Sequence, residues 1–255
     1  MDQRFRRAAA GAGVGPVRRA LLAAAGLLAC LAVAAPAEAQ LRVDKRADLA
    51  SPVKLGPNQG AILLGFLRPD KMSAGKSATV AFARYDLRHR DVVFQPKGAK
   101  KRGDTTTYWV QARNGDKSLE RDYAVMVVSA GDYVLYGATP GPGGQVANTF
   151  CLGAPTFSVK PGEVVYFGEF TPYMNVKLVD GGRTFAMAYS SHADEAQHFL
   201  ANHAELAPAF RPAELRNEAT YGCAGQSMMA YAVPGVPAIE AAGPEAAEDS
   251  PEPAQ

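Results

Sequence analysis

The feature that most constrains this chain is a series of short apolar segments, separated by turn-forming residues, between positions 61 and 232. Segments this short, bounded by Gly, Pro, Asn and Asp, are typical of β-strands. The predicted strands are 61–67, 77–85, 92–95, 106–112, 123–129, 133–137, 156–159, 164–167, 174–179, 184–189 and 227–232. Many short strands in succession favour an antiparallel β-sandwich or barrel, so we predict a mainly β fold of the sandwich type.

Glycine-containing turns indicate how these strands connect. Asp-Gly-Gly at 180–182 and Asn-Gly at 114–115 each predict a tight hairpin, because glycine adopts the positive φ angles of such turns. A second pattern places Val, two residues, Gly, an acid, four apolar residues and Gly at 128–137 and again at 159–168. A third copy begins at Val179. Repeated turns of one pattern predict a β-meander.

One segment near the end of the chain has helical character. Asp194 and Glu195 suit the positive end of a helix dipole, apolar residues follow at helical spacing, and Pro208 stops the pattern. We therefore predict a helix over about 192–206, with Ser190 or Ser191 as its cap.

The first 39 residues have the layout of a cleavable secretory signal. Arginines precede an apolar stretch at 20–35, and small residues follow Pro36. This predicts cleavage between Ala39 and Gln40. The apolar stretch is shorter than the roughly 20 residues that span a bilayer, so no transmembrane helix is expected after the signal is removed.

Two locations follow from this leader. Cleavage after Ala39 predicts a periplasmic or secreted protein. Alternatively, Leu-Leu-Ala-Cys at 27–30 resembles a lipoprotein box. Cys30 would then carry a lipid and anchor the protein in the outer membrane.

The segment that follows the predicted β region differs from it in composition. No Lys or Arg follows Arg216, and 234–255 consists largely of Pro, Ala, Gly and acidic residues. Such a segment cannot bury enough apolar surface to offset its ordering entropy, which predicts a disordered acidic tail. The expected organisation is an extended segment at 40–59, a β-sandwich domain at 60–233 and the tail.

Two cysteines remain once the signal is removed. In an exported chain, Cys151 and Cys223 are most simply paired in a disulfide. On the loop-entropy model such a bridge destabilises the unfolded chain by roughly 4 kcal/mol. The alternative is two buried thiols.

Several segments together resemble a known group of proteins. They are the strand at 61–69 that ends in Arg-Pro, Ala-Gly-Asp-Tyr-Val-Leu-Tyr at 130–136, and the segment at 151–168. They resemble exported bacterial envelope proteins of a domain-of-unknown-function family, many of them lipoproteins. The resemblance covers about residues 60–190. It implies an immunoglobulin- or transthyretin-like β-sandwich and no catalytic residues.

The sequence predicts no catalytic residue, metal ligand or cofactor. His192, His198 and His203 are six and five residues apart, whereas zinc ligands on one helix face are four apart. Ser191, His192 and Asp194 are adjacent in sequence, which suits a helix cap better than a catalytic triad assembled from separate loops.

One basic run is the predicted contact surface. It comprises Lys97, Lys100, Lys101 and Arg102, with Trp109 shortly after. The formal net charge is only +2, which argues against nucleic acid as a partner. An unknown envelope protein or an anionic surface fits this run, and a solvated loop is the simpler alternative.

These observations favour an exported, non-catalytic envelope binding or structural module. Two other functions stay open. One is a periplasmic hydrolase whose site is assembled from several loops. The other is a carrier of a small apolar ligand held between the sheets.

Overall fold

In the computed structural model, the described residues are 43–44, 47–67, 77–94, 105–113, 121–140, 148–223 and 227–240. They belong to one compact unit, Gln40–Gln255. The predicted signal peptide, its cleavage site at Ala39 and Gln40, and the alternative lipidation site at Cys30 lie outside the described residues.

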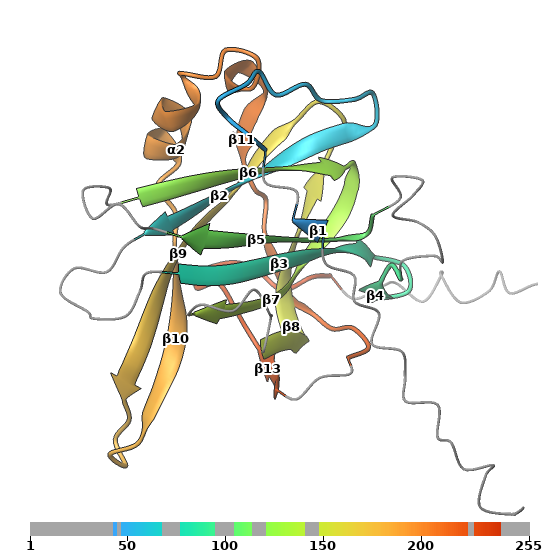
Figure 1. The fold of residues 1–255 in the computed structure, drawn as a ribbon. Helices are drawn as coiled ribbons and strands as arrows, with labels where there is room; N and C mark the ends of the chain where they lie inside the picture. Colours follow the sequence, from blue (N-terminus) through green and yellow to red (C-terminus); the bar gives the residue numbers. More distant parts are fainter. Residues whose placement is uncertain are drawn as a thin grey trace, which may run out of the picture. The chain divides into compact units, whose positions relative to one another are not determined.

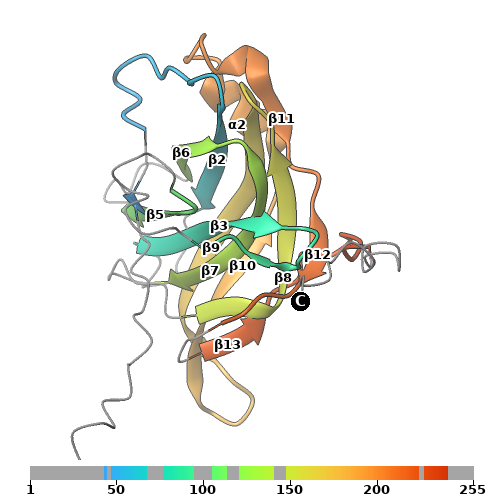
Figure 2. The ribbon, with the colours of Figure 1, turned by 90° about the vertical axis from the view of Figure 1, so that its right-hand side faces the viewer.

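The described residues form two β-sheets (Figures 1 and 2). Sheet A has the order β1-β5-β3-β7-β8-β12, with β4 also paired to β3 and β13 to β8. Sheet B has the order β10-β9-β2-β6, with β11 also paired to β9. The bounds are β1 (Val43–Asp44), β2 (Gln59–Leu67), β3 (Ser77–Asp86), β4 (Asp91–Val92), β5 (Thr107–Arg113), β6 (Arg121–Ser129), β7 (Gly131–Pro140), β8 (Asn148–Val159), β9 (Val164–Lys177), β10 (Arg183–Ser190), β11 (Phe210–Pro212), β12 (Arg216–Ala219) and β13 (Ser227–Ala230).

Aromatic rings fill much of the core of this fold. Phe82 of sheet A packs edge-on against Phe167 of sheet B, with ring centroids 4.9 Å apart. Phe157 contacts both rings, at 5.5 Å and 5.2 Å. Most strand pairs are antiparallel, although the central pair of β2 and β9 is parallel. The predicted mainly β sandwich is confirmed.

Two of the repeated glycine turns connect different sheets. The chain leaves sheet B at the end of β6 and enters sheet A at Gly131, the start of β7. It returns from β8 to β9 through a turn that contains Gly162, whose φ is +78°. The predicted β-meander is therefore wrong. The repeat marks corners at which the chain changes sheets, and the apolar run after each corner is long because its strand is covered on both faces.

The turn at 180–182 is the hairpin that the sequence predicts. The Leu178 N–H donates to the Gly182 carbonyl at 2.9 Å, and Gly181 adopts a φ of +85°. This turn joins β9 to β10, which are antiparallel neighbours. The second predicted hairpin, at 114–115, lies outside the described residues.

The helix is shorter than predicted. Helix α2 (Ala193–Leu200) ends where two turns begin, and these turns lead to a short 3-10 helix (Ala207–Ala209). The turns bury Leu206 in the same apolar cluster as Leu200. They also place the Glu205 carboxylate 3.0 Å from the Val53 N–H. This packing replaces the last turns of the predicted helix.

The end of the described chain is tied to sheet A. Cys151 of β8 forms a disulfide with Cys223, and their Cα atoms are 5.9 Å apart, within the usual range for a bridge. Residues 234–240, which the sequence assigned to the tail, pack beside Asn217. The Asn217 N–H donates to the Pro237 carbonyl at 2.8 Å. The described body therefore extends to Glu240, and 241–255 lie outside it.

Strand β9 has two unlike halves. Through Phe170, which pairs with Phe66, it lies beside β2 in sheet B. After Phe170 its only strand partner among the described residues is β10. Residues 171–188 therefore form a two-stranded ribbon, called the ribbon below, which projects beyond the other strands of sheet B (Figures 1 and 2).

Candidate functional site

A fully buried carboxylate lies on β9, just before the ribbon begins. Glu169 has an exposure of 0%, and acidic side chains are almost never this buried unless they are paired. Its side chain crosses Gly65 of the neighbouring strand β2. A Cβ atom at position 65 would lie 2.5 Å from Cγ of Glu169. Only glycine at position 65 leaves room for this carboxylate.

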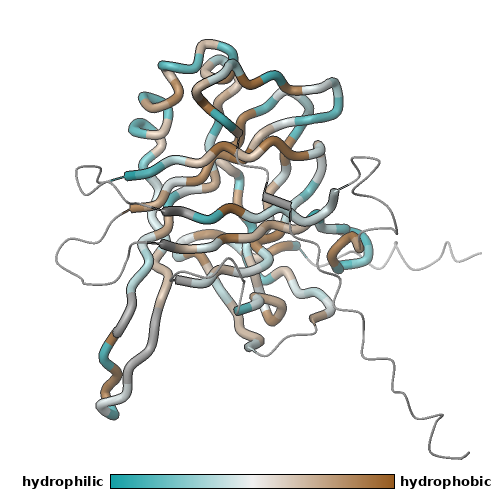
Figure 3. The backbone as a smooth tube through the Cα atoms, viewed as in Figure 1, coloured by the Kyte–Doolittle hydropathy of each residue, from teal (hydrophilic) through white to brown (hydrophobic). Residues whose placement is uncertain are grey.

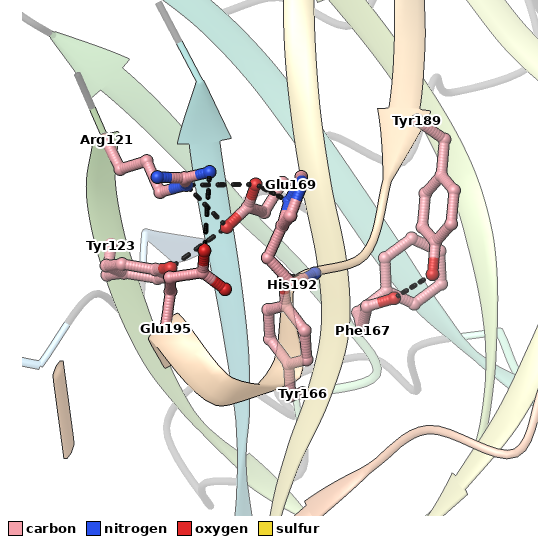
Figure 4. Close-up of polar contacts among 8 residues, drawn as sticks. All are labelled: Arg121, Tyr123, Tyr166, Phe167, Glu169, Tyr189, His192 and Glu195. Atoms are coloured by element: carbon pink, nitrogen blue, oxygen red, sulfur yellow. Dashed lines mark hydrogen bonds and ion pairs between the residues drawn. The ribbon is translucent and has the colours of Figure 1, made fainter. Parts of the chain in front are cut away.

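Three side chains donate hydrogen bonds to Glu169 (Figure 4). The Tyr123 hydroxyl lies 2.9 Å from Oε1, and Nδ1 of His192 lies 2.8 Å from Oε2. Nε of Arg121 donates to Oε2 at 3.4 Å and forms an ion pair with Oε1 at 3.3 Å. Both carboxylate oxygens are therefore bound by the protein itself.

These donors come from different elements and fasten the helix to sheet B. Arg121 and Tyr123 lie on β6, at the edge of the sheet, while His192 immediately precedes α2. The His192 N–H also donates to the Tyr166 hydroxyl at 3.1 Å. Arg121 reaches from Glu169 to Glu195 on the helix, with 3.9 Å between Nη2 and Oε1. We call these residues, together with Glu169, the Glu169 cluster.

The tyrosines of the cluster are held in their protonated forms. Burial, and next the hydrogen bond to Glu169, raise the pKa of Tyr123 far above its ordinary value of 10.0. Burial likewise raises the pKa of Tyr166. Both hydroxyls therefore stay neutral at physiological pH, and that of Tyr123 remains a donor to the carboxylate.

Sequence reasoning assigned His192 a different role. It placed His192 in a helix cap beside Ser191 and Asp194, but the side chain of His192, the N-cap residue, makes no capping hydrogen bond. Its ring binds Glu169, 23 residues earlier in the chain. The sequence feature that pointed to such a contact is a single acid, Glu169, inside the apolar run at 164–170. An acid that is buried with its strand needs hydrogen-bond partners from elsewhere in the chain.

The structure describes only one of the residues of the predicted contact surface. Lys97, Lys100, Lys101 and Arg102 lie outside the described residues. Trp109 lies on β5 and is partly exposed. Its buried indole N–H has no hydrogen-bond partner among the described residues. Of the predicted contact residues, the structure therefore describes Trp109 alone, and the contact surface stays a prediction.

Two searches of the described residues concern metals and membranes. No group of three or more His, Cys, Asp and Glu residues is placed to hold a metal ion within the described ranges. No helix in this part of the chain is both long and apolar enough to cross a bilayer.

Comparisons of the chain with protein-family models, with curated proteins and with solved structures gave no match.

Proposed function

We propose that this protein is an exported, non-catalytic binding or structural module of the cell envelope. The leader-like sequence at 1–39 motivates export. The disulfide between Cys151 and Cys223 fits an oxidising compartment, because such bonds are rare where thiols are kept reduced.

The observation that carries the non-catalytic part of this proposal is the enclosure of Glu169. A general acid or base must come within hydrogen-bond reach of its substrate. The Glu169 carboxylate has no exposed surface, and Tyr123, His192 and Arg121 bind both of its oxygens. The hydrogen bonds and the ion pair of Glu169 hold β6, β9 and the start of α2 together.

The core also weighs against a carrier of small apolar ligands. Such a carrier needs unfilled space between its sheets. The rings of Phe82, Phe157 and Phe167 contact one another there, and Tyr133 stacks on Phe157 with centroids 5.9 Å apart. These rings occupy the region that a ligand would need.

A hydrolase is the second candidate, and one contact favours it. Glu169 binds Nδ1 of His192 as the acid of a catalytic triad binds its histidine. Ser190 pairs directly with Glu169 across the strands, but its hydroxyl oxygen is buried and has no hydrogen-bond partner in the described part of the chain. A nucleophile must instead be accessible to its substrate and bonded to the base.

Two measurements on the full chain test the proposal. The first is hydrolysis of short-chain nitrophenyl esters by the wild type and by His192→Ala. We expect no turnover that depends on His192. Hydrolysis lost in this variant, with the fold intact by circular dichroism, would establish the hydrolase instead.

The second measurement is retention in the envelope fraction of a Gram-negative host. Lys100→Glu/Lys101→Glu reverses two charges of the predicted contact surface, and Lys54→Glu/Lys160→Glu is the matched control at two exposed lysines. We expect crosslinked, envelope-associated protein to fall in the first variant alone. Equal retention of both variants contradicts a role for the basic run, and a cytoplasmic, reduced protein contradicts export.

A further inference from the structure

Arg84, near the end of β3, is a cation without an acidic partner among the described residues. Its Nε atom is buried and has no hydrogen-bond partner in this part of the chain. The arginine ion pairs of the described residues are those of Arg121 and Arg211. An arginine side chain stays charged at physiological pH, and a charge held partly out of water is costly unless it is paired. This position therefore favours a bound anion.

The fold places the guanidinium of Arg84 against the backbone at Gly131, the corner where β7 begins. A Cβ atom at position 131 would lie 2.8 Å from Nη2 of Arg84, and the φ of Gly131 is +149°. Arg84 as a whole is partly exposed. One side of its guanidinium is therefore packed against the protein, while the residue remains accessible from outside.

A second unpaired polar group lies beside Arg84. The Arg84 N–H donates to the Thr106 carbonyl at 2.7 Å. Because Ala83 pairs with Thr107, Thr106 is opposite Arg84 in the same antiparallel register, where side chains share one face. Thr106 is 4% exposed, and its buried hydroxyl has no hydrogen-bond partner among the described residues. The two neighbouring side chains each have a donor that is unused.

The other polar groups around Arg84 do not supply the missing negative charge. Tyr133 is its Cα partner on β7. Burial raises the pKa of Tyr133 far above 10.0, and its neutral hydroxyl donates to the Ser129 carbonyl. Asp86, two residues after Arg84, and Asp132, next to Tyr133, accept hydrogen bonds from other groups. The anion for Arg84 therefore has to come from outside the described residues.

A carboxylate group fits the two donors of Arg84 and Thr106. The planar guanidinium fork matches the two oxygens of a carboxylate, and a threonine hydroxyl donates one further hydrogen bond. A phosphate group brings more oxygens and up to two charges, whereas this pair of residues offers a single cation. The described structure contains one such pairing already, because Nη2 of Arg211 lies 2.7 Å from Oε2 of Glu163.

The chain itself carries carboxylates that start close to Arg84. The carbonyl of Glu240, the last described residue, accepts a hydrogen bond from Nη2 of Arg90 at 3.3 Å. Arg90 lies in the mostly hydrophilic turn between β3 and β4 (Figure 3). Val93, just after this turn, donates its N–H to the Arg84 carbonyl at 2.8 Å. Segment 241–255 therefore begins beside the hairpin that contains Arg84.

The composition and length of segment 241–255 suit this contact. It contains four acids and no Lys or Arg. An extended chain of this length spans up to roughly 50 Å, so its acids can reach the hairpin beside which it begins. An acid of this segment would also be present at a high effective concentration, because it is tethered to the same chain.

From this arrangement we infer that Arg84 and Thr106 form a binding site for a carboxylate group, and that an acid of segment 241–255 supplies it. The site holds the acidic segment against the hairpin of β3 and β4. This inference does not depend on the envelope function proposed above.

NMR signals of the arginine Nε–H groups test the inference on the full chain in chloride buffer. The wild type is compared with an amide variant in which the four acids are neutralised: Glu245→Gln, Glu248→Gln, Asp249→Asn and Glu252→Gln. The Arg84 signal is identified by its loss in Arg84→Lys. We expect this signal to differ between the wild type and the amide variant, because the carboxylate is present only in the wild type.

Arg211 provides the matched control within the same spectra. Its Nε is also buried without a hydrogen-bond partner in the described part of the chain, but its Nη2 already binds Glu163. The Arg211 signal should therefore be the same in both chains. A shift of both signals would indicate a general change of the fold and would contradict a specific contact at Arg84.

Sodium acetate, added at constant ionic strength, measures the site with a free carboxylate. In the amide variant we expect acetate to move the Arg84 signal toward its wild-type position. The wild type should need at least about fivefold more acetate, because its own segment competes. Adding Thr106→Val to the amide variant should weaken its response to acetate by about fivefold, through the loss of one hydrogen bond. Urea unfolding verifies that the variants at positions 84 and 106 are folded.

The outcomes separate the site from the source of its ligand. An Arg84 signal that neither the amide substitutions nor acetate move overturns the inference. If acetate moves the signal equally in both chains while the amide substitutions leave it in place, the carboxylate comes from another molecule, and the role of segment 241–255 is overturned. A stronger response to sodium phosphate than to acetate overturns the choice of a carboxylate.

Discussion

The two halves of strand β9 share one backbone but meet different surroundings. In the first half, Val164, Val165, Tyr166, Phe167, Glu169 and Phe170 are all buried. In the second half, Thr171 is still buried, but Lys177 is exposed, and the strand leads into the exposed pair of Leu178 and Val179. The first half lies beside β2, whereas the second has β10 alone.

The two halves also differ in composition. Residues 164–170 are apolar apart from Gly168 and Glu169, whereas 171–177 include Thr171, Asn175 and Lys177. The half with more neighbouring strands is therefore also the more apolar half. The first half, which lies beside β2, contains even a buried carboxylate, because β6 and the residue before α2 supply its hydrogen-bond donors. The ribbon leaves valine in water because nothing in the described chain covers its tip.

The largest expected effect is a loss of stability at alkaline pH, which involves tyrosines in the core and around the first half of β9. Burial raises the pKa of Tyr123, Tyr133, Tyr166 and Tyr221 above 10.0. Above about pH 10 the unfolded chain releases these protons while the folded chain keeps them. Stability is therefore complete below that pH and falls as the pH rises, by up to about 1.4 kcal/mol per pH unit for each tyrosine.

Urea titrations between about pH 9 and pH 11 measure this slope. Tyr123→Phe should reduce it by the share of one tyrosine. A free energy of unfolding that stays constant through this range would contradict the enclosed state of these hydroxyls.

The next effect compares the two halves of β9 directly. Phe170 is fully buried, so Phe170→Ala should lower the free energy of unfolding by about 3–5 kcal/mol. Val179→Ala, in the ribbon tip, should change it by less than about 0.5 kcal/mol. Thermal and urea unfolding of both variants give the comparison. Similar losses at the two positions would mean that the ribbon is as tightly packed as the core.

A smaller effect is expected from the buried carboxylate. Glu169→Gln leaves Arg121 and His192 without their charged acceptor and should cost about 2–3 kcal/mol. Glu195→Gln is the control, because Glu195 is 49% exposed and its ion pair with Arg121 is long, at 3.9 Å. That variant should lose less than about 1 kcal/mol.

Hydrogen exchange of the α2 amides locates the effect. Protection in α2 should fall in Glu169→Gln and stay near the wild-type level in Glu195→Gln. Equal protection in both variants would show that apolar packing, through residues such as Ala196 and Leu200, holds the helix without the carboxylate.

Local sequence patterns were sufficient for several parts of the fold. Each predicted segment overlaps an observed strand, since a strand's composition reflects its own burial. The segments predicted at 164–167 and 174–179 are parts of one strand, β9, and the short strands β1, β11 and β12 were not predicted. The 180–182 hairpin follows from its glycines, because a positive φ is a property of a single residue. Because Cys30 lies in the predicted signal, Cys151 and Cys223 were the pair that the sequence favoured, and the structure joins them in a disulfide.

Partners far apart in sequence were decided by the tertiary structure. The corners at Gly131 and Gly162 share the pattern of hairpins, and only strand pairing shows that they change sheets. Glu169 meets Tyr123 and His192 across 46 and 23 residues. Strand β9 likewise continues past the end of its contact with β2 and pairs there with β10, which makes the ribbon. The sequence by itself determined the strands and their turns, because those depend on neighbouring residues; which strands pair, and which side chains they bring to Glu169, depend on packing over the whole chain.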